Sequence, residues 1–267
     1  MRNYVYMVVV VLATSIPATV YAGAWTQSAG KGQMIVNGLY YTTDKLYNNT
    51  GNKASQARYS KYELNPYFEY GLTDSITAGA NLFFLRADQA TQDNWGVGDS
   101  EFFLRARLFQ SAGFMLSVEP MVKLPSPEGS NETPQLGSRK PDAGVGLSAG
   151  YGFSAWGQNH FANIDTGYRY RFGDPEDQIK LSGTLGIGVN DRWMIMPQAF
   201  ATLRTIKPAI ASFTQSSGDD YNLVKLQIST IYKVSDETSL QFGVFSHVGG
   251  NNVGAGDGII LSLWKKI

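Results

Sequence analysis

The sequence predicts an all-β protein: a transmembrane, antiparallel, up-and-down β-barrel of about 12 strands, with short periplasmic turns and long outer loops. Three observations predict this fold. Apolar and polar residues alternate with a period of two in segments of about ten residues, the length that a membrane-crossing strand needs. In four of these segments all charged residues share one parity, so they lie on one face of the strand. The connections between segments are alternately short and long, as in outer-membrane barrels.

The composition of the 267 residues excludes several classes of protein. The chain has 22 basic and 22 acidic residues, so it lacks the basic excess of a nucleic-acid-binding protein, and we expect no nucleic-acid partner. Its 13% of aromatic residues and its zero net charge are the opposite of a disordered composition. Without cysteine, the chain has no disulfide, no thiol catalysis and no cysteine-ligated metal. We expect no cofactor and no metal site.

The first 22 residues have the pattern of a secretory signal. One charged residue, Arg2, precedes an almost unbroken apolar run over residues 4–20, and small residues follow this run. The pattern is typical of a bacterial signal peptide with cleavage after Ala22. An N-terminal membrane anchor is the alternative, although the run is short for a span. We therefore expect a signal peptide over residues 1–22, a single β-barrel domain over residues 23–267, and a location in the cell outer membrane.

Alternating segments follow one another through the rest of the chain. In residues 60–70, Glu63 and Glu69 lie on the charged face, whereas Leu64 and Phe68 lie on the apolar face. An even number of such strands leaves both ends of the chain on the periplasmic side. The predicted strands are residues 33–43, 60–70, 76–85, 102–108, 114–124, 143–153, 161–172, 178–189, 194–203, 222–234, 239–248 and 258–266.

The predicted connections alternate between the two ends of the barrel. The short turns are residues 71–75, 110–113, 155–160, 190–192 and 235–238. The outer loops are residues 44–59, 87–98, 125–141, 173–177, 205–220 and 249–256. A soluble β-sandwich is the alternative, but it would bury too few of these long apolar faces.

Aromatic residues gather near both ends of the predicted strands, where two belts would meet the two membrane interfaces. The belt near the loops comprises Tyr40, Tyr41, Tyr62, Phe84, Tyr168, Tyr170 and Tyr221. The belt near the turns comprises Tyr67, Tyr70, Tyr151, Phe153, Trp193, Tyr232 and Trp264.

Several stretches resemble an outer-membrane family. The strand and turn at residues 67–75, the strand opening at 96–107, and the segment 118–125, which ends in Leu-Pro, resemble motifs of the phenol-degradation-pathway (MetA-type) outer-membrane family. Residues 24–27, Ala-Trp-Thr-Gln, resemble the start of its XagA-like branch. The motifs cover the first half of the chain, and the second half matches by pattern only. The resemblance implies a distant relation to hydrocarbon and fatty-acid transport barrels, and hence the passage of small molecules. Only about ten residues precede the first predicted strand, whereas those transporters have a sizeable N-terminal plug.

If the apolar face meets lipid, the charged face lines the lumen. Twelve strands fall between barrels that are filled by side chains and barrels that leave an open channel, so we expect a narrow or closed bore. An excess of basic residues on this face would favour anions. The alternative is that these charges pair with one another and only hold the barrel together. The predicted pore-lining residues are Glu63, Glu69, Glu101, Arg105, Arg107, Glu119, Lys123, Asp165, Arg169, Arg171, Lys180 and Lys225.

We expect no catalytic residue. The sequence has two histidines: His160 in a predicted turn, and His247, which adjoins Ser246 and lies near Asn251. A Ser-His-Asn arrangement could serve a lipid-modifying barrel enzyme. Adjacent residues of a strand point to opposite faces, however, which separates the Ser246 hydroxyl from the His247 ring.

Three functional hypotheses follow from the sequence. The first is a narrow channel or transporter for small molecules. The second is a non-conducting barrel whose outer loops bind partners or surfaces, and the third is the lipid-modifying enzyme. The expected partners are outer-membrane lipid and lipopolysaccharide, the barrel-assembly machinery, and a small-molecule solute.

Overall fold

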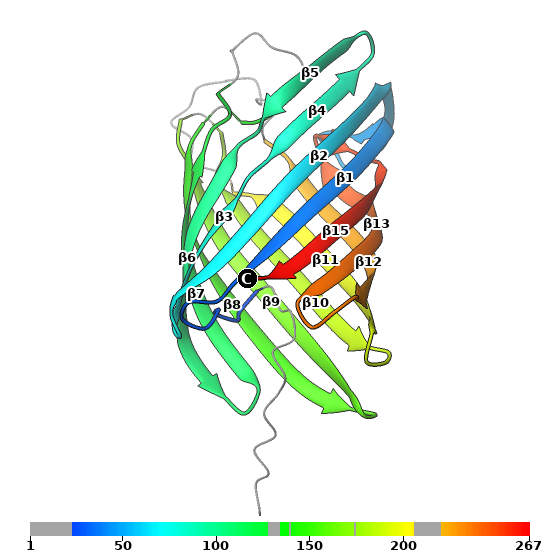
Figure 1. Cartoon of the computed structure of the whole chain (residues 1–267). Coiled ribbons are helices and arrows are strands. Elements are labelled where there is room, and N and C mark those ends of the chain that lie inside the picture. Colours follow the sequence, from blue (N-terminus) through cyan, green and yellow to red (C-terminus); the bar gives the residue numbers. More distant parts are fainter. Residues whose placement is uncertain (1–22, 128–133, 139, 174, 206–219) are drawn as a thin grey trace, which may run out of the picture.

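The computed structural model describes residues 23–127, 134–138, 140–173, 175–205 and 220–267, which form a closed antiparallel β-barrel (Figure 1). The predicted signal peptide, residues 1–22, lies outside the described residues. The strands are β1 (Gly32–Tyr47), β2 (Lys53–Thr73), β3 (Ile76–Asn81), β4 (Phe84–Gln89), β5 (Gln92–Val97), β6 (Ser100–Ser111), β7 (Phe114–Leu124), β8 (Asp142–Ala155), β9 (Gln158–Arg171), β10 (Gln178–Gly188), β11 (Trp193–Arg204), β12 (Asn222–Lys233), β13 (Thr238–Asn251), β14 (Val253–Gly254) and β15 (Asp257–Lys266).

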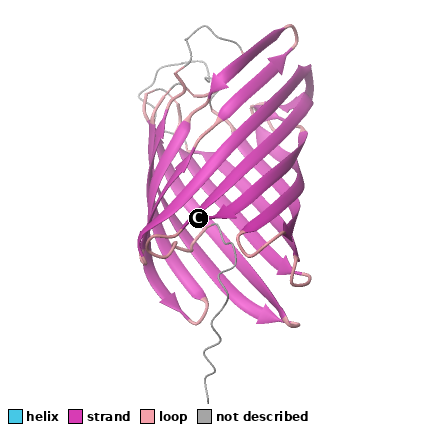
Figure 2. Ribbon diagram, viewed as in Figure 1, coloured by secondary structure: helices cyan, strands magenta, loops and turns pink. Residues whose placement is uncertain are grey.

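The strands follow one another around the wall in sequence order. Strand β1 pairs with β2 on one side and with β15 on the other, so the sheet closes on itself and the wall has no free edge. Twelve strands make the wall, if the broken strand β3–β4 is counted once and β5 and β14 are left out. The predicted fold class is confirmed. Figure 2 shows the described residues as strands and loops, and none of them forms a helix that could cross a membrane.

The predicted strand 76–85 and the predicted loop 87–98 differ from the structure. The strand breaks after Asn81, and its second part, β4, pairs with β2 and β5 instead of β6. Strands β4 and β5 form a hairpin that rises beyond the wall (Figure 1). The sequence pattern does not predict this hairpin, because polar residues such as Arg86, Asp88 and Gln92 interrupt the apolar alternation that marks a wall strand.

The predicted loop 44–59 is also wrong, because β1 and β2 continue through most of it. Only residues 48–52 connect the two strands. Asn48 forms this turn: its Oδ1 accepts hydrogen bonds from the backbone N–H groups of Thr50 (3.0 Å) and Asn52 (2.9 Å). Most of the predicted loop 205–220 lies outside the described residues.

At the opposite end of the barrel, two-residue turns connect β6 to β7 and β8 to β9. Ala112 and Gly113 have φ values of 44° and 86°, and Trp156 and Gly157 have 51° and 72°. Two successive positive φ values are typical of the turn that matches the right-handed twist of a hairpin. Because the second turn is so short, His160 lies in β9 and not in a turn as predicted. Its ring is buried and stacks on Phe153 at 5.2 Å.

The two faces of the wall differ as the alternation predicts. Leu64, Leu181 and Ile228 point outward and are 49%, 41% and 53% exposed, whereas Glu69 is only 1% exposed. Large apolar side chains cover the outer surface on nearly every strand. A surface of this kind matches the apolar lipid-facing band of a transmembrane barrel.

The two predicted aromatic belts are correct only in part. Tyr62, Tyr168 and Tyr170 near the loops, and Tyr70, Tyr151 and Trp193 near the turns, are exposed on the outer surface. Tyr41, Tyr67 and Trp264 instead point into the barrel, because they share the parity of the polar face. Trp264 forms a buried cluster in the interior with Ile35, Phe161 and Met196.

Candidate functional site

Residues 23–31, which we call the N-terminal segment, lie inside the barrel. They lie at the end that carries the two-residue turns, in the lower half of the barrel in Figure 1. We call this the inner end and the opposite, loop-bearing end the outer end. The backbone N–H of Ala24 donates to Asn163 Oδ1 on β9 (2.9 Å), and the N–H of Gln27 donates to Thr77 Oγ1 on β3 (2.8 Å). Ser117 on β7 donates to the carbonyl of Ala24. The segment is therefore bound to strands from about half of the inner wall.

Trp25 is the largest side chain of the N-terminal segment. Its ring packs edge-to-face on Phe161, with the centroids 5.9 Å apart, and it extends the buried cluster around Trp264. It also covers Gly150, where a Cβ atom would lie 2.5 Å from the indole. Before β1, the described part of the chain has only this short segment, which lies against the inner wall at the inner end.

A buried ion-pair network fixes the N-terminal segment to the wall. Arg105 on β6 pairs through Nη1 with Glu69 Oε1 (2.6 Å) and through Nη2 with Glu119 Oε2 (2.7 Å). It also donates to the carbonyl of Trp25 (3.1 Å). Gln27 donates to the second oxygen of Glu69 (2.8 Å). We call these side chains the Arg105 network; in it one guanidinium group pairs with two carboxylates.

Further charged residues lie in the middle of the lumen. Arg169 on β9 pairs with Glu101 on β6, so this contact bridges strands that are not neighbours in the wall. Asp165 accepts a hydrogen bond from Ser182 Oγ (2.6 Å). Lys180 donates to Thr202 Oγ1 (3.1 Å) and has no ion-pair partner among the described residues.

At the outer rim, Asp99 joins the wall to the predicted loop 125–141. Its carboxylate accepts hydrogen bonds from the backbone N–H groups of Ser126 (2.8 Å) and Ser138 (2.9 Å), and it pairs with Lys123 Nζ (2.9 Å). Partial burial alone would raise the pKa of Asp99. The two N–H donors and Lys123 outweigh it, so the pKa lies below its ordinary value.

The structure places the predicted pore-lining residues in different settings. Arg107 lies near the inner rim and bonds to Ser75 and Gln110. Asp165 and Lys180 have hydrogen bonds only, and Lys225 has neither a hydrogen bond nor an ion pair among the described residues. The other predicted residues all form ion pairs: Glu63, Glu69, Glu101, Glu119, Arg105, Lys123, Arg169 and Arg171.

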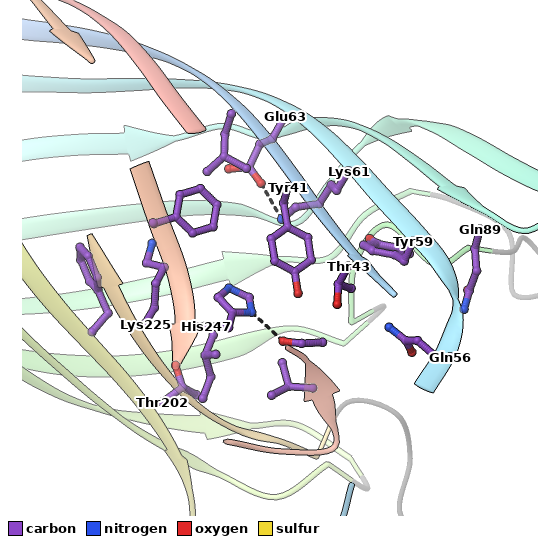
Figure 3. Close-up of a pocket in the computed structure, with 16 residues that line it drawn as sticks. Tyr41, Thr43, Gln56, Tyr59, Lys61, Glu63, Gln89, Thr202, Lys225 and His247 are labelled. Carbon is purple, nitrogen blue, oxygen red and sulfur yellow. Dashed lines mark hydrogen bonds and ion pairs between the residues drawn. The ribbon is translucent and has the colours of Figure 1, made fainter. Parts of the chain in front are cut away.

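Two cavities occupy the lumen above the N-terminal segment. The outer cavity, of about 520 Å³, is lined by β1, β2, β11, β12 and β13 (Figure 3). The inner cavity, of about 440 Å³, reaches from Gly23 to Lys180. Both are lined by Phe200 and Thr202, so they adjoin each other. Volumes of this size suit small molecules.

The sequence analysis does not place several residues of the outer cavity among the pore-lining residues. Tyr41, Tyr59, Lys61 and His247 line it together with Lys225. Lys61 shares the parity of Glu63, which could have identified it, and the two form an ion pair (2.9 Å). The ring of Tyr41 stacks on the rings of Phe245 (6.2 Å) and His247 (4.6 Å), which are neighbours on β13.

Among the described residues that line the cavity with His247, none is a serine. Its Nδ1 lies 2.9 Å from the carbonyl oxygen of Gly254. Ser246 is paired with Asp257 in the neighbouring strand and adjoins the outward-facing Leu226. No group of three or more His, Asp or Glu side chains within the described ranges could hold a metal ion.

Comparisons with known proteins give a likeness in fold. No protein-family model matches the sequence, and no curated protein matches it. The COG4313 outer membrane channel from Pseudomonas putida F1 is similar over 93% of this chain and 100% of its own, with a TM-score of 0.71 and 16% identity. The NanC porin is similar over 88% of this chain and 100% of its own (TM-score 0.53, 8% identity). The KdgM porin, solved in complex with oligogalacturonate, is similar over 86% of this chain and 98% of its own (TM-score 0.51, 7% identity). These similarities show the barrel fold.

Proposed function

We propose that the protein is an outer-membrane channel that passes small solutes and prefers anions. One observation carries the proposal: Lys225 in the outer cavity has no ion-pair partner among the described residues. The other charged residues that line this cavity, Lys61 and Glu63, pair with each other, and in the inner cavity the charges of Lys180 and Asp165 offset each other. A bore whose uncompensated charges are positive attracts anions and repels cations.

The outer surface supports the outer-membrane location. The exposed apolar band would be costly in water and is favourable in lipid, where a closed barrel leaves no backbone group unpaired. Signal-peptide cleavage after Ala22, membership of the MetA-type family, and contact with lipopolysaccharide and the barrel-assembly machinery are parts of this proposal. The similar fold of a channel and two porins supports it.

The N-terminal segment makes the channel narrow. It lies at the inner end of the lumen, where Trp25 packs on Phe161 and accepts a hydrogen bond from Arg105 through its carbonyl, and the inner cavity begins beside it at Gly23. Solutes would pass beside this segment, so the proposed channel has a low conductance.

Planar-bilayer recordings of the refolded protein test the proposal. In a KCl gradient, the reversal potential should show preference for Cl⁻ over K⁺. Lys180→Met and Lys225→Met should each lower the Cl⁻ preference, and the double variant should lower it further. A barrel that never conducts, or one that prefers K⁺, overturns the proposal.

A second candidate function is binding through the outer loops. The β4–β5 hairpin projects beyond the wall, and Trp95 on it is 78% exposed, which is typical of a contact surface. If this is the main role, deleting residues 86–95 abolishes function, and substituting lumen lysines has no effect.

A further inference from the structure

The outer cavity has features that a passage for simple ions does not need. Lys225 lies on β12, and its ammonium group lies over the rings of Phe200 (4.2 Å) and Phe245 (5.2 Å). These rings hold the ammonium group on the cavity wall. The Lys61–Glu63 pair nearby is neutral as a unit, so Lys225 leaves the cavity with one net positive charge.

A second group in the cavity lacks a good hydrogen bond. Tyr41 is only 5% exposed, and its buried hydroxyl has Thr43 and the backbone of Gly256 as polar neighbours but no hydrogen bond of good geometry among the described residues. The ring packs against Phe245 and His247, which lie side by side on β13, and these contacts fix the direction of the hydroxyl. Burying a polar group without a good hydrogen bond is unfavourable, and a ligand that bonds to the hydroxyl would remove this cost.

The two groups lie on different sides of the cavity. In Figure 3, Lys225 projects from one wall, and the hydroxyl of Tyr41 points to the space beside Thr43 and His247. A ligand that satisfies both must therefore have an anionic group at one end and a hydroxyl group farther along its body. The side chains of Leu39, Phe200, Leu223 and Val253 provide an apolar part of the lining.

We propose that the outer cavity binds a small hydroxycarboxylate, with its carboxylate on Lys225 and a hydroxyl on Tyr41. This inference rests on the proposed function, because it names the class of solute that the channel selects. The hydroxyl of Tyr41 can donate to or accept from a ligand hydroxyl, which suits an alcohol group. A plain fatty carboxylate would leave Tyr41 without a partner and would bind more weakly.

Three six-carbon probes separate the two contacts. Gluconate has both groups, hexanoate has only the carboxylate, and glucitol has only the hydroxyls. Isothermal titration of the full-length protein in detergent should rank them gluconate first, with the other two at least about tenfold weaker. Equal affinity for gluconate and glucitol, or for gluconate and hexanoate, overturns the proposal.

Two variants assign the contacts to their residues. Tyr41→Phe removes only the hydroxyl and should weaken gluconate about three- to tenfold, with hexanoate changed less than about twofold. Lys225→Met should weaken both carboxylates at least about tenfold and leave glucitol unchanged. If Tyr41→Phe affects both carboxylates equally, the hydroxyl contact is wrong.

Matched controls keep the test specific. Tyr62→Phe is the control for Tyr41→Phe, because it removes a tyrosine hydroxyl on the outer surface. Lys233→Met is the control for Lys225→Met, because it removes a lysine at the periplasmic turn, where Lys233 pairs with Asp236. Neither should alter gluconate affinity. Heat-dependent gel mobility shows that each variant is folded. Ion currents separate the two proposals: a barrel that conducts but does not select gluconate contradicts this inference alone, and a silent barrel that binds gluconate contradicts the channel alone.

Discussion

Arg105 at the inner end of the lumen and Lys225 at the outer end lie on the same face of the wall but differ in their surroundings. Arg105 contacts Glu69, Glu119 and the carbonyl of Trp25, whereas Lys225 has no hydrogen bond or ion pair among the described residues. The charge of Arg105 is neutralised by carboxylates of the barrel wall. In the proposed channel, the charge of Lys225 is available to a solute. The difference shows that the parity of a charge predicts its face, and that its neighbours determine its role.

The largest expected effect is on stability at the inner end. Arg105→Met leaves Glu69 buried without its cation, which should cost about 3–5 kcal/mol of unfolding free energy. Lys225→Met removes a charge that has no ion pair, and methionine can keep a contact with the rings of Phe200 and Phe245, so it should cost less than about 1 kcal/mol. Urea unfolding of the refolded barrel, followed by gel mobility, measures both. Similar losses for the two variants would contradict the comparison.

The second prediction tests which face of the wall points to lipid and which points to the lumen. Leu181 and Lys180 are neighbours on β10, with Leu181 outward and Lys180 lining the inner cavity. Leu181→Arg should cost about 2–4 kcal/mol in lipid, because it places a charge in the apolar band. Lys180→Ala should fold normally. The yield of folded protein after refolding into vesicles measures this, and the reverse ranking would mean that the faces are assigned backwards.

Much of the wall was predictable because lipid imposes a simple rule on it. Alternation correctly separates Leu64 and Ile228 outside from Glu69 inside. The rule fails where the strand leaves lipid, since neither face of β4 and β5 then needs to be apolar. It also fails for Tyr41, Tyr67 and Trp264, because aromatic residues suit both a membrane interface and a filled lumen.

The sequence predicts which charged residues face the lumen, but it does not predict how they are arranged there. The sequence identifies Arg105 and Lys225 as members of the charged face but not which charges pair, because Arg169 and Glu101 meet across the lumen from strands that do not adjoin. The N-terminal segment could not be placed either. Its contacts with Asn163 and Ser117 depend on side chains more than 90 residues away in the sequence.

The third prediction concerns the N-terminal segment, which is present at the inner end of the lumen and absent from the outer end. Trp25→Ala empties space beside Phe161 and loosens the N-terminal segment, so single-channel conductance should rise severalfold. The loss of stability should be about 1–3 kcal/mol, below the value for a fully buried tryptophan because Trp25 is partly exposed. Trp156→Ala, at a turn where the ring is 90% exposed, is the control and should change neither quantity. Unchanged conductance in Trp25→Ala would mean that the segment does not limit flow.

The smallest expected effect concerns the outer rim and its dependence on pH. The pKa of folded Asp99 lies below the ordinary value of 3.8, so its bonds to Ser126, Ser138 and Lys123 stabilise the fold above that value. This contribution should disappear as the pH falls through the folded pKa. Asp99→Asn should therefore cost about 1 kcal/mol at neutral pH, and the difference from the unmodified protein should shrink below about pH 4.

Urea unfolding at several pH values measures the contribution of Asp99, and Asp236→Asn serves as the control. Asp236 pairs with Lys233 in an exposed turn, where solvent screens the contact, so this variant should differ little from the unmodified protein at any pH. A constant cost for Asp99→Asn across the pH range would show that shape, and not charge, holds the outer loop to the wall. In that case, the charge of Asp99 would not stabilise the outer rim, and the charges with a proposed function would be those that line the two lumen cavities.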